Sequence, residues 1–108
     1  MSADLQIVLC TVPDRETADM IAGALVTEEL AACVNILPGV TSVYRWQGAV
    51  EQSQELLLVI KTRQAVWSML EAQIQALHPY ELPEIVAVPI TSGEADYIQW
   101  LENSIPAS

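Results

Sequence analysis

Hydrophobic residues follow two periodicities along the chain, one typical of strands and one typical of helices. Segments with apolar residues in alternating positions, or on both faces, predict four strands, at residues 5–11, 33–46, 50–62 and 83–90. Apolar residues spaced three and four apart predict two longer helices, at residues 15–30 and 63–77. A short helix is predicted after Ser92-Gly93. The predicted order is therefore β-α-β-β-α-β with a terminal helix.

Residues at the ends of the predicted helices suggest how each one begins or stops. Asp14 is placed to cap the first helix, and Thr62 to cap the second. His78 precedes Pro79, and a residue before proline avoids the helical region, so the second helix is expected to end there. The buried side of the terminal helix is expected to consist of Tyr97, Trp100 and Leu101.

Two prolines select the order of the strands in the sheet. Pro38 and Pro89 lie inside the second and fourth predicted strands, and proline cannot donate to a strand ladder, so both strands belong at edges. The second and third strands flank the tight-turn signal Gln47-Gly48 and must be neighbours. Only the order 4-1-3-2 meets these conditions. It predicts an α+β fold of the ferredoxin-like type, as a single domain over residues 1–108.

The central strands are apolar on both faces, which this fold does not by itself explain. Both long helices should cover one side of the sheet, leaving the other side to polar residues. Instead Ile7 and Leu9 alternate with Val8 and Cys10, and the third strand has the same character. We therefore expect identical subunits to cover the second face; a monomer with its C-terminal residues folded across the sheet is the alternative. A one-residue shift exchanges the faces, so the sequence leaves open which one meets the helices.

Composition limits the partners and the compartment. The chain carries 14 acidic and 4 basic residues, a net charge of −10, which repels nucleic acids and anionic membranes and attracts cations. The longest aliphatic run, residues 56–60, is too short to span a bilayer, and residues 1–4 lack the positive charge of a signal peptide. Two cysteines are too few for a disulfide scaffold. A reducing, cytoplasmic setting is expected.

Cys10 and His78 are the candidate metal ligands. Cys10 ends the first strand, and His78 is the only histidine. A thiolate with an imidazole suits copper or another soft transition ion, and an open or intersubunit site is more plausible than a closed zinc site. Each residue also has a structural interpretation: Cys10 as a small buried hydrophobe, and His78 as a cap for the last carbonyl groups of its helix.

A second candidate site involves the cation Lys61 and several aromatic residues. Lys61 closes an apolar run and needs a carboxylate partner, for which the candidates are Glu51, Glu55, Glu81 and Glu84. An ion pair between strands is the structural interpretation. The functional one is a ligand-binding cleft between subunits, formed by Lys61, Tyr44, Trp46, Tyr80 and Glu81. An enzyme with His78 or Glu81 as base is the least supported hypothesis, because no nucleophile or oxyanion donors are evident.

Six segments taken together resemble the CutA divalent-cation tolerance proteins, at residues 9–14, 30–35, 38–46, 60–62, 78–85 and 96–101. The resemblance covers residues 5–102. It implies a ferredoxin-like subunit in a homotrimer similar to the PII-type signalling trimers, and a link to metal tolerance with copper(II) binding. Cys10 and His78 match two copper ligands of bacterial members, while Leu77 stands where those members have an adjacent histidine. We expect a non-enzymatic, copper-binding homotrimer, with PII-like small-molecule sensing as the alternative.

Overall fold

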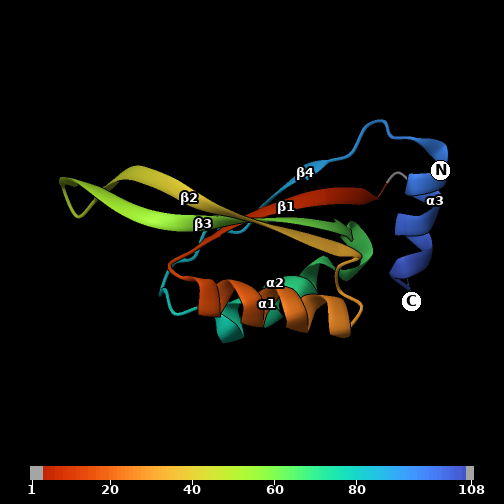
Figure 1. Ribbon diagram of the computed structural model, residues 1–108, viewed down its shortest axis with the longest axis horizontal. Helices are drawn as coiled ribbons and strands as arrows, with labels where there is room; N and C mark the ends of the chain where they lie inside the picture. Colours follow the sequence, from red (N-terminus) through yellow and green to blue (C-terminus); the bar gives the residue numbers. More distant parts are fainter. Residues whose placement is uncertain (1–3, 107–108) are drawn as a thin grey trace.

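The computed structural model describes residues 4–106, in which four antiparallel strands form one sheet with two helices packed on one side (Figure 1). The elements are β1 (Leu5–Val12), α1 (Arg15–Thr27), β2 (Cys33–Trp46), β3 (Ala49–Arg63), a 3₁₀ turn (Gln64–Val66), α2 (Trp67–Leu77), β4 (Val86–Pro89) and α3 (Ala95–Ser104). No helix within this range is long and apolar enough to cross a membrane. The N-terminal residues used for the signal-peptide prediction lie outside the described part, except Asp4.

The strand order is β2-β3-β1-β4, which is the predicted order 4-1-3-2 counted from the other edge. The prolines therefore lie where they were expected, Pro38 in edge strand β2 and Pro89 in edge strand β4. The predicted ferredoxin-like sandwich with a terminal helix is confirmed. Asp14 caps α1 as predicted, because its side chain accepts a hydrogen bond of 2.8 Å from the Thr17 amide.

Strands β2 and β3 extend beyond the rest of the sheet as a hairpin arm, residues 40–55 (Figure 1). The pairing with β1 covers only β3 residues 56–63, so the arm has no third strand beside it. Its turn has positive φ angles at Gln47 and Gly48, as in the hairpin turns whose twist matches that of the strands. At its base the register shifts between Leu37 and Val40, at the predicted Pro38-Gly39 interruption.

The register decides which face of the central strands meets the helices. Val8 lies opposite Ile60 and Cys10 opposite Leu58, and all four side chains are fully buried in the core with α1 and α2. The odd-numbered side chains of both strands point to the other side, which neither long helix covers (Figure 1). We call this surface the open face; it comprises Ile7, Leu9, Leu37, Leu57, Val59, Val86 and Val88.

Several element ends differ from the predictions, and helix α1 ends at Thr27 rather than at residue 30. Thr62 does not cap the second helix; it lies buried on the helix-facing side of β3, and its hydroxyl donates to the Leu30 carbonyl at 2.7 Å. A 3₁₀ turn precedes α2, which has no side-chain cap at Val66. The fourth strand was predicted over residues 83–90 but comprises only Val86–Pro89. Pro83 has no amide hydrogen to give to a ladder, which is consistent with the later start.

The buried side of α3 also differs from the prediction. Leu101 is buried as expected, but its buried partners are Ile98 and Ile105, at helical spacings of three and four. Tyr97 and Trp100 each lie one position earlier, which turns them away from the core. They are 43% and 46% exposed, and their rings lie against each other with centroids 5.4 Å apart.

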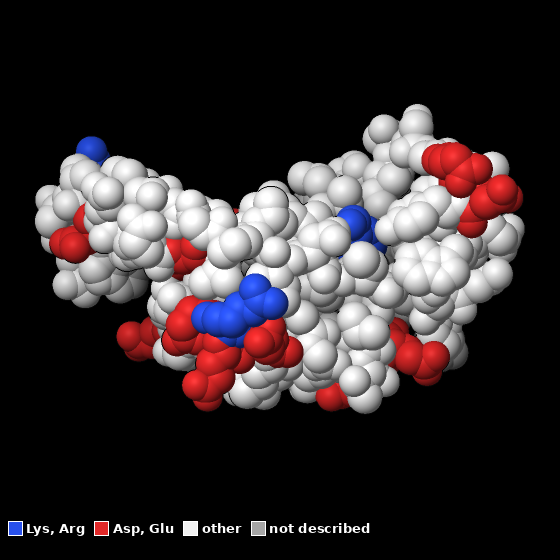
Figure 2. All heavy atoms as spheres, viewed as in Figure 1, with Lys and Arg blue, Asp and Glu red and all other residues white. Residues whose placement is uncertain are grey.

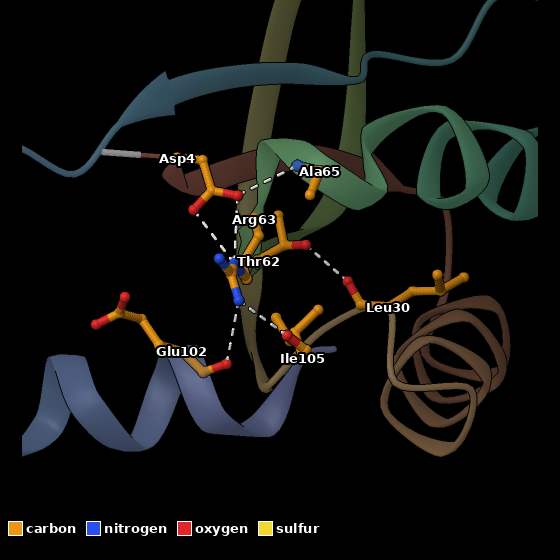
Figure 3. A network of polar contacts seen from close by, with 7 residues as sticks. All are labelled: Asp4, Leu30, Thr62, Arg63, Ala65, Glu102 and Ile105. Atoms are coloured by element: carbon orange, nitrogen blue, oxygen red, sulfur yellow. Dashed lines mark hydrogen bonds and ion pairs between the residues drawn. The ribbon is translucent and has the colours of Figure 1, made fainter. Parts of the chain in front are cut away.

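Arg63 links α3 to the end of the sheet through hydrogen bonds and an ion pair (Figure 3). Its Nε lies 3.2 Å from both carboxylate oxygens of Asp4, and its Nη1 donates to the carbonyls of Glu102 and Ile105 at 3.4 and 3.2 Å. Asp4 also accepts a hydrogen bond from the Ala65 amide. A cation is favourable beside the last carbonyls of a helix, where the helix dipole is negative. One side chain thus joins β3, the start of β1 and the C-terminal end of α3.

Replacing this arginine should destabilise the protein measurably. We expect Arg63→Met to lower the free energy of unfolding by about 1–3 kcal/mol, the range for lost hydrogen bonds to a charged group, as measured by urea denaturation. Arg15→Met is the matched control, because the ion pair of Arg15 with Asp19 is exposed and worth about 0.5 kcal/mol or less. Equal effects of the two substitutions would contradict the proposed role of Arg63.

Candidate functional site

A cleft with a volume of about 780 Å³ lies where the hairpin arm meets the segment that connects α2 to β4. We call it the arm cleft. Strand β1 contributes Thr11, and β3 contributes Glu55. The remaining lining residues come from the arm side of β2 and from the connecting segment, namely Ser42, Val43, Tyr44, Trp46, Pro79, Tyr80, Glu81, Leu82 and Glu84. The lining is thus rich in aromatic rings and carboxylates, and it includes no lysine or arginine.

Glu55 is the most buried carboxylate of this cleft. Only 7% of the residue is exposed, and its Oε2 accepts a hydrogen bond of 2.8 Å from the Tyr80 hydroxyl. Burial, together with the hydrogen bond to Glu55 and its charge, raises the pKa of Tyr80 to about 12. Tyr80 therefore keeps its proton at neutral pH and acts as a donor. Among the described residues, no ion pair within 4 Å involves Glu55.

His78 is held by both of its ring nitrogens. The Tyr80 amide donates to Nδ1 at 3.1 Å, so the ring proton is on Nε2, which donates to the Thr11 carbonyl at 2.8 Å. The residue is only 7% exposed. Its side chain thus connects the end of α2 to β1, rather than bonding the last carbonyls of its own helix as the structural interpretation supposed. A metal ion could bind this ring only after one of these bonds is broken.

Cys10 lies close to the same carbonyl but belongs to the core. Its sulfur is 3.8 Å from the Thr11 oxygen, and the residue is fully buried beneath the helices. Burial, together with the negative charges of Glu84 and Glu55, raises the pKa of the Cys10 thiol to about 12. The thiol is thus protonated at neutral pH. Within residues 4–106, no group of three or more His, Cys, Asp or Glu side chains is arranged to hold a metal ion.

Lys61 lies outside the arm cleft. Its Nζ donates to the side-chain oxygen of Asn35 on β2, instead of pairing with one of the predicted glutamates. It lies six residues from Glu55 along β3, or about 20 Å at the usual strand rise. Within one chain, the arm cleft brings together Tyr44, Trp46, Tyr80 and Glu81 without Lys61, and the predicted cleft between subunits stays a prediction.

The predicted set lacks four polar residues that line the cleft, namely Thr11, Ser42, Glu55 and Glu84. Glu55 was considered only as a partner for Lys61. A signal was available in its position, because Glu55 directly precedes the apolar run 56–60 in a strand that becomes central to the sheet. An acidic residue at that boundary is expected to need a specific partner.

Sequence comparison decides the family. The sequence model of the CutA1 divalent ion tolerance protein family matches residues 6–104. The chain belongs to this family. The Divalent-cation tolerance protein CutA of Thermus thermophilus is 54% identical over 99 residues, which span 92% of this chain and 96% of that protein. The chloroplastic CutA of Arabidopsis thaliana is 49% identical, and this chain spans about half its length, with coverage of 91% and 54% respectively.

Solved CutA structures agree with the fold. The divalent cation tolerance protein of Thermus thermophilus superimposes with a TM-score of 0.93 at 53% identity, covering 94% of this chain and 99% of that one. CutA1 of Oryza sativa gives a TM-score of 0.94 at 43% identity, with coverage of 99% and 98%. The family resemblance seen in the sequence motifs is thus confirmed, and so is the fold that it implied.

The buried Cys10 thiol should make the protein less stable at alkaline pH. Its pKa is raised from 9.0 to about 12 on folding, so the unfolded chain loses this proton first, and the stability present below pH 9 is lost as pH rises. Between pH 9 and 10 we expect Cys10 to cause a loss of about 1 kcal/mol in the free energy of unfolding, and Tyr80 to add a smaller loss near pH 10. Urea denaturation at pH 9 and at pH 10 measures this loss in the free energy of unfolding.

Two cysteine variants assign that pH dependence. Cys10→Ala should remove most of the loss, whereas Cys33→Ala, at the other free cysteine, should retain it. If Cys10→Ala keeps the wild-type pH dependence, Cys10 is not the group whose ionisation is suppressed by folding.

Proposed function

We propose that this chain acts in divalent-cation tolerance, as a non-enzymatic homotrimer in the cytoplasm that binds divalent metal ions, copper(II) foremost. The role is supported by the relationship to proteins named for divalent-cation tolerance. The net charge of −10 favours association with cations, and carboxylates are distributed over the face seen in Figure 2, with basic side chains in small separate patches. The two free cysteines are consistent with a reducing compartment.

The observation that carries the proposal of an assembly is the open face, which neither long helix covers. Val86, Val88 and Leu37 are 50%, 46% and 43% exposed, beside the aliphatic side chains of β1 and β3. Helix α3 lies across one end of the sheet, so the described C-terminal segment does not fold over this face as a monomer would require (Figure 1). Aliphatic surface of this kind is typical of an interface between subunits. The number of three subunits is the one that the sequence resemblance implies, and it is part of the proposal.

The proposed copper ligands are Cys10 and His78, whose side chains both approach the Thr11 carbonyl. Copper binding there requires His78 to release one hydrogen bond and Cys10 to release its proton. Both changes cost free energy, so we expect a site of modest affinity in the isolated subunit. Residues from a neighbouring subunit would complete the coordination.

A second candidate function is small-molecule sensing of the PII-like kind, with the arm cleft as the ligand site. Its volume falls within the range of about 300–1,000 Å³ that is usual for such sites. Aromatic rings and a few polar groups converge in it, as they do where small molecules are oriented. Lys61 has no part in this version of the hypothesis.

Adjacent residues on opposite faces of β3 provide the test of assembly. We expect Val59→Asp, on the open face, to preserve the fold but reduce the mass of the assembly toward 11.8 kDa in light scattering. Leu58→Asp buries an unpaired charge beneath the helices and should unfold the subunit, with a cost of several kcal/mol. Met69→Asp, at an exposed position of α2, should change neither the fold nor the mass of the assembly. An intact assembly for Val59→Asp would refute the interface.

Copper(II) titration by calorimetry tests the metal ligands. We expect saturable binding that His78→Ala and Cys10→Ala each weaken by about 10–100-fold, since even the loss of an outer-sphere partner costs this much at many metal sites. Leu77→His, which supplies the adjacent histidine of the bacterial pattern, should strengthen binding. Unchanged affinity in both alanine variants would show that neither residue is a ligand.

A further inference from the structure

We propose that the arm cleft binds an organic cation, a small molecule whose protonated amino groups are joined by a hydrocarbon segment. This inference rests on the second candidate function, ligand binding in the cleft, and adds the chemical class of the ligand. It follows from three features of the lining. These are a buried carboxylate without a positively charged partner, exposed aromatic rings, and hydrogen bonds that hold the carboxylate and the rings in place.

The charge of the cleft calls for a cation. Buried carboxylates are normally paired with a positive group, because removing a charge from water is costly. Glu55 is 93% buried, yet its only hydrogen-bond partner among the described residues is the neutral Tyr80 hydroxyl, on one of its two oxygens. Glu81 and Glu84 also line the cleft, and no basic residue of the same described chain does. Phosphates and other anions are therefore repelled, whereas an ammonium group would neutralise Glu55.

The aromatic residues favour an organic cation over a metal ion. Trp46, Tyr44 and Tyr80 line the cleft and are 46%, 43% and 37% exposed. Ring faces attract ammonium groups and also bury the methylene groups attached to them. A hydrated inorganic ion gains little from such contacts. In addition, the carboxylates here are not grouped as a metal site within the described residues.

Hydrogen bonds hold two of these rings in place before any ligand arrives. The Tyr80 hydroxyl is fixed by Glu55, and the Tyr44 hydroxyl lies 2.7 Å from the Ser53 hydroxyl across the arm. The Tyr80 ring also lies against the His78 ring, with centroids 4.7 Å apart. Side chains that are already ordered lose little conformational entropy on binding, so the cleft is preorganised to recognise a ligand.

Calorimetric titration of the assembled wild-type protein with three probes tests the ligand class. The probes are 1,4-diaminobutane, the neutral analogue 1,4-butanediol, and Mg²⁺ as an inorganic dication of equal charge. At pH 7 and low salt we expect saturable binding of the diamine, affinity for Mg²⁺ at least tenfold weaker, and no detectable binding of the diol. Equal binding of the diol, or of Mg²⁺, would overturn the proposed class and leave a cleft with another kind of ligand.

Variants locate the site. Glu55→Gln can still accept the Tyr80 hydrogen bond but loses the charge, and should weaken diamine binding tenfold or more. Trp46→Ala should weaken it about threefold or more by removing a cation–π contact, whereas Trp46→Phe should retain most of the affinity. Asp96→Asn removes one exposed charge on α3, at the opposite end of the sheet, and should have less than a twofold effect. Equal losses for Asp96→Asn and Glu55→Gln would overturn the site.

Two readouts separate this inference from the proposals on which it depends. Each variant is checked for thermal unfolding and assembly mass, and Glu84→Gln, at an exposed lining residue, replaces Glu55→Gln if the latter fails to fold. Absence of diamine binding in a correctly assembled wild-type protein overturns the inference. Because the copper titration and the mass of the assembly are measured independently, that result leaves the tolerance role and the trimer unaffected.

Discussion

The rest of this structure depends on a sheet whose two faces both carry apolar side chains, although the two long helices pack on only one of them. The central residues of β1 and β3, 7–10 and 56–60, are apolar on both faces, and α1 and α2 cover the even-numbered set. Full burial of an exposed Val, Leu or Ile side chain is worth about 1.5–3 kcal/mol. Leu37, Val86 and Val88 are 43%, 50% and 46% exposed and the other open-face side chains are partly buried, so the open face retains a driving force for association. Against it stands the cost of association, about 4–15 kcal/mol. A broad aliphatic interface is the simplest way to exceed that cost.

The candidate sites follow from the same architecture. Because β1 ends at Val12, the hairpin arm continues without a neighbour on that side, and the arm cleft opens at this point. Thr11 connects the two candidate sites: it lines the cleft together with Glu55 and Tyr80, and its carbonyl accepts a hydrogen bond from His78 and lies 3.8 Å from the Cys10 sulfur. The packing that stabilises Cys10 beneath the helices also removes it from solvent, which explains why the cleft is a more accessible binding site than the sulfur.

Local rules were sufficient to predict the fold, whereas the site required information from distant parts of the chain. Pro38 and Pro89 determined the edges, and the strand order followed from them. Thr62 was misassigned because a threonine before a helix resembles a cap, although its buried position on β3 directs its hydroxyl to Leu30. Within one chain Lys61 lies on β3 away from the arm cleft, which could not be predicted because sequence spacing does not reveal which end of a long strand a cleft occupies, and the cleft between subunits stays a prediction.

The central claim is that a single folded chain does not persist as a soluble monomer with its open face exposed to water. Sedimentation velocity of the wild-type protein, diluted to nanomolar concentration at 0.15 M salt with fluorescence detection, tests it most directly. The account predicts a single species of about three times the 11.8 kDa chain mass that persists on dilution. A folded, soluble species of 11.8 kDa that stays monomeric at high concentration would contradict it.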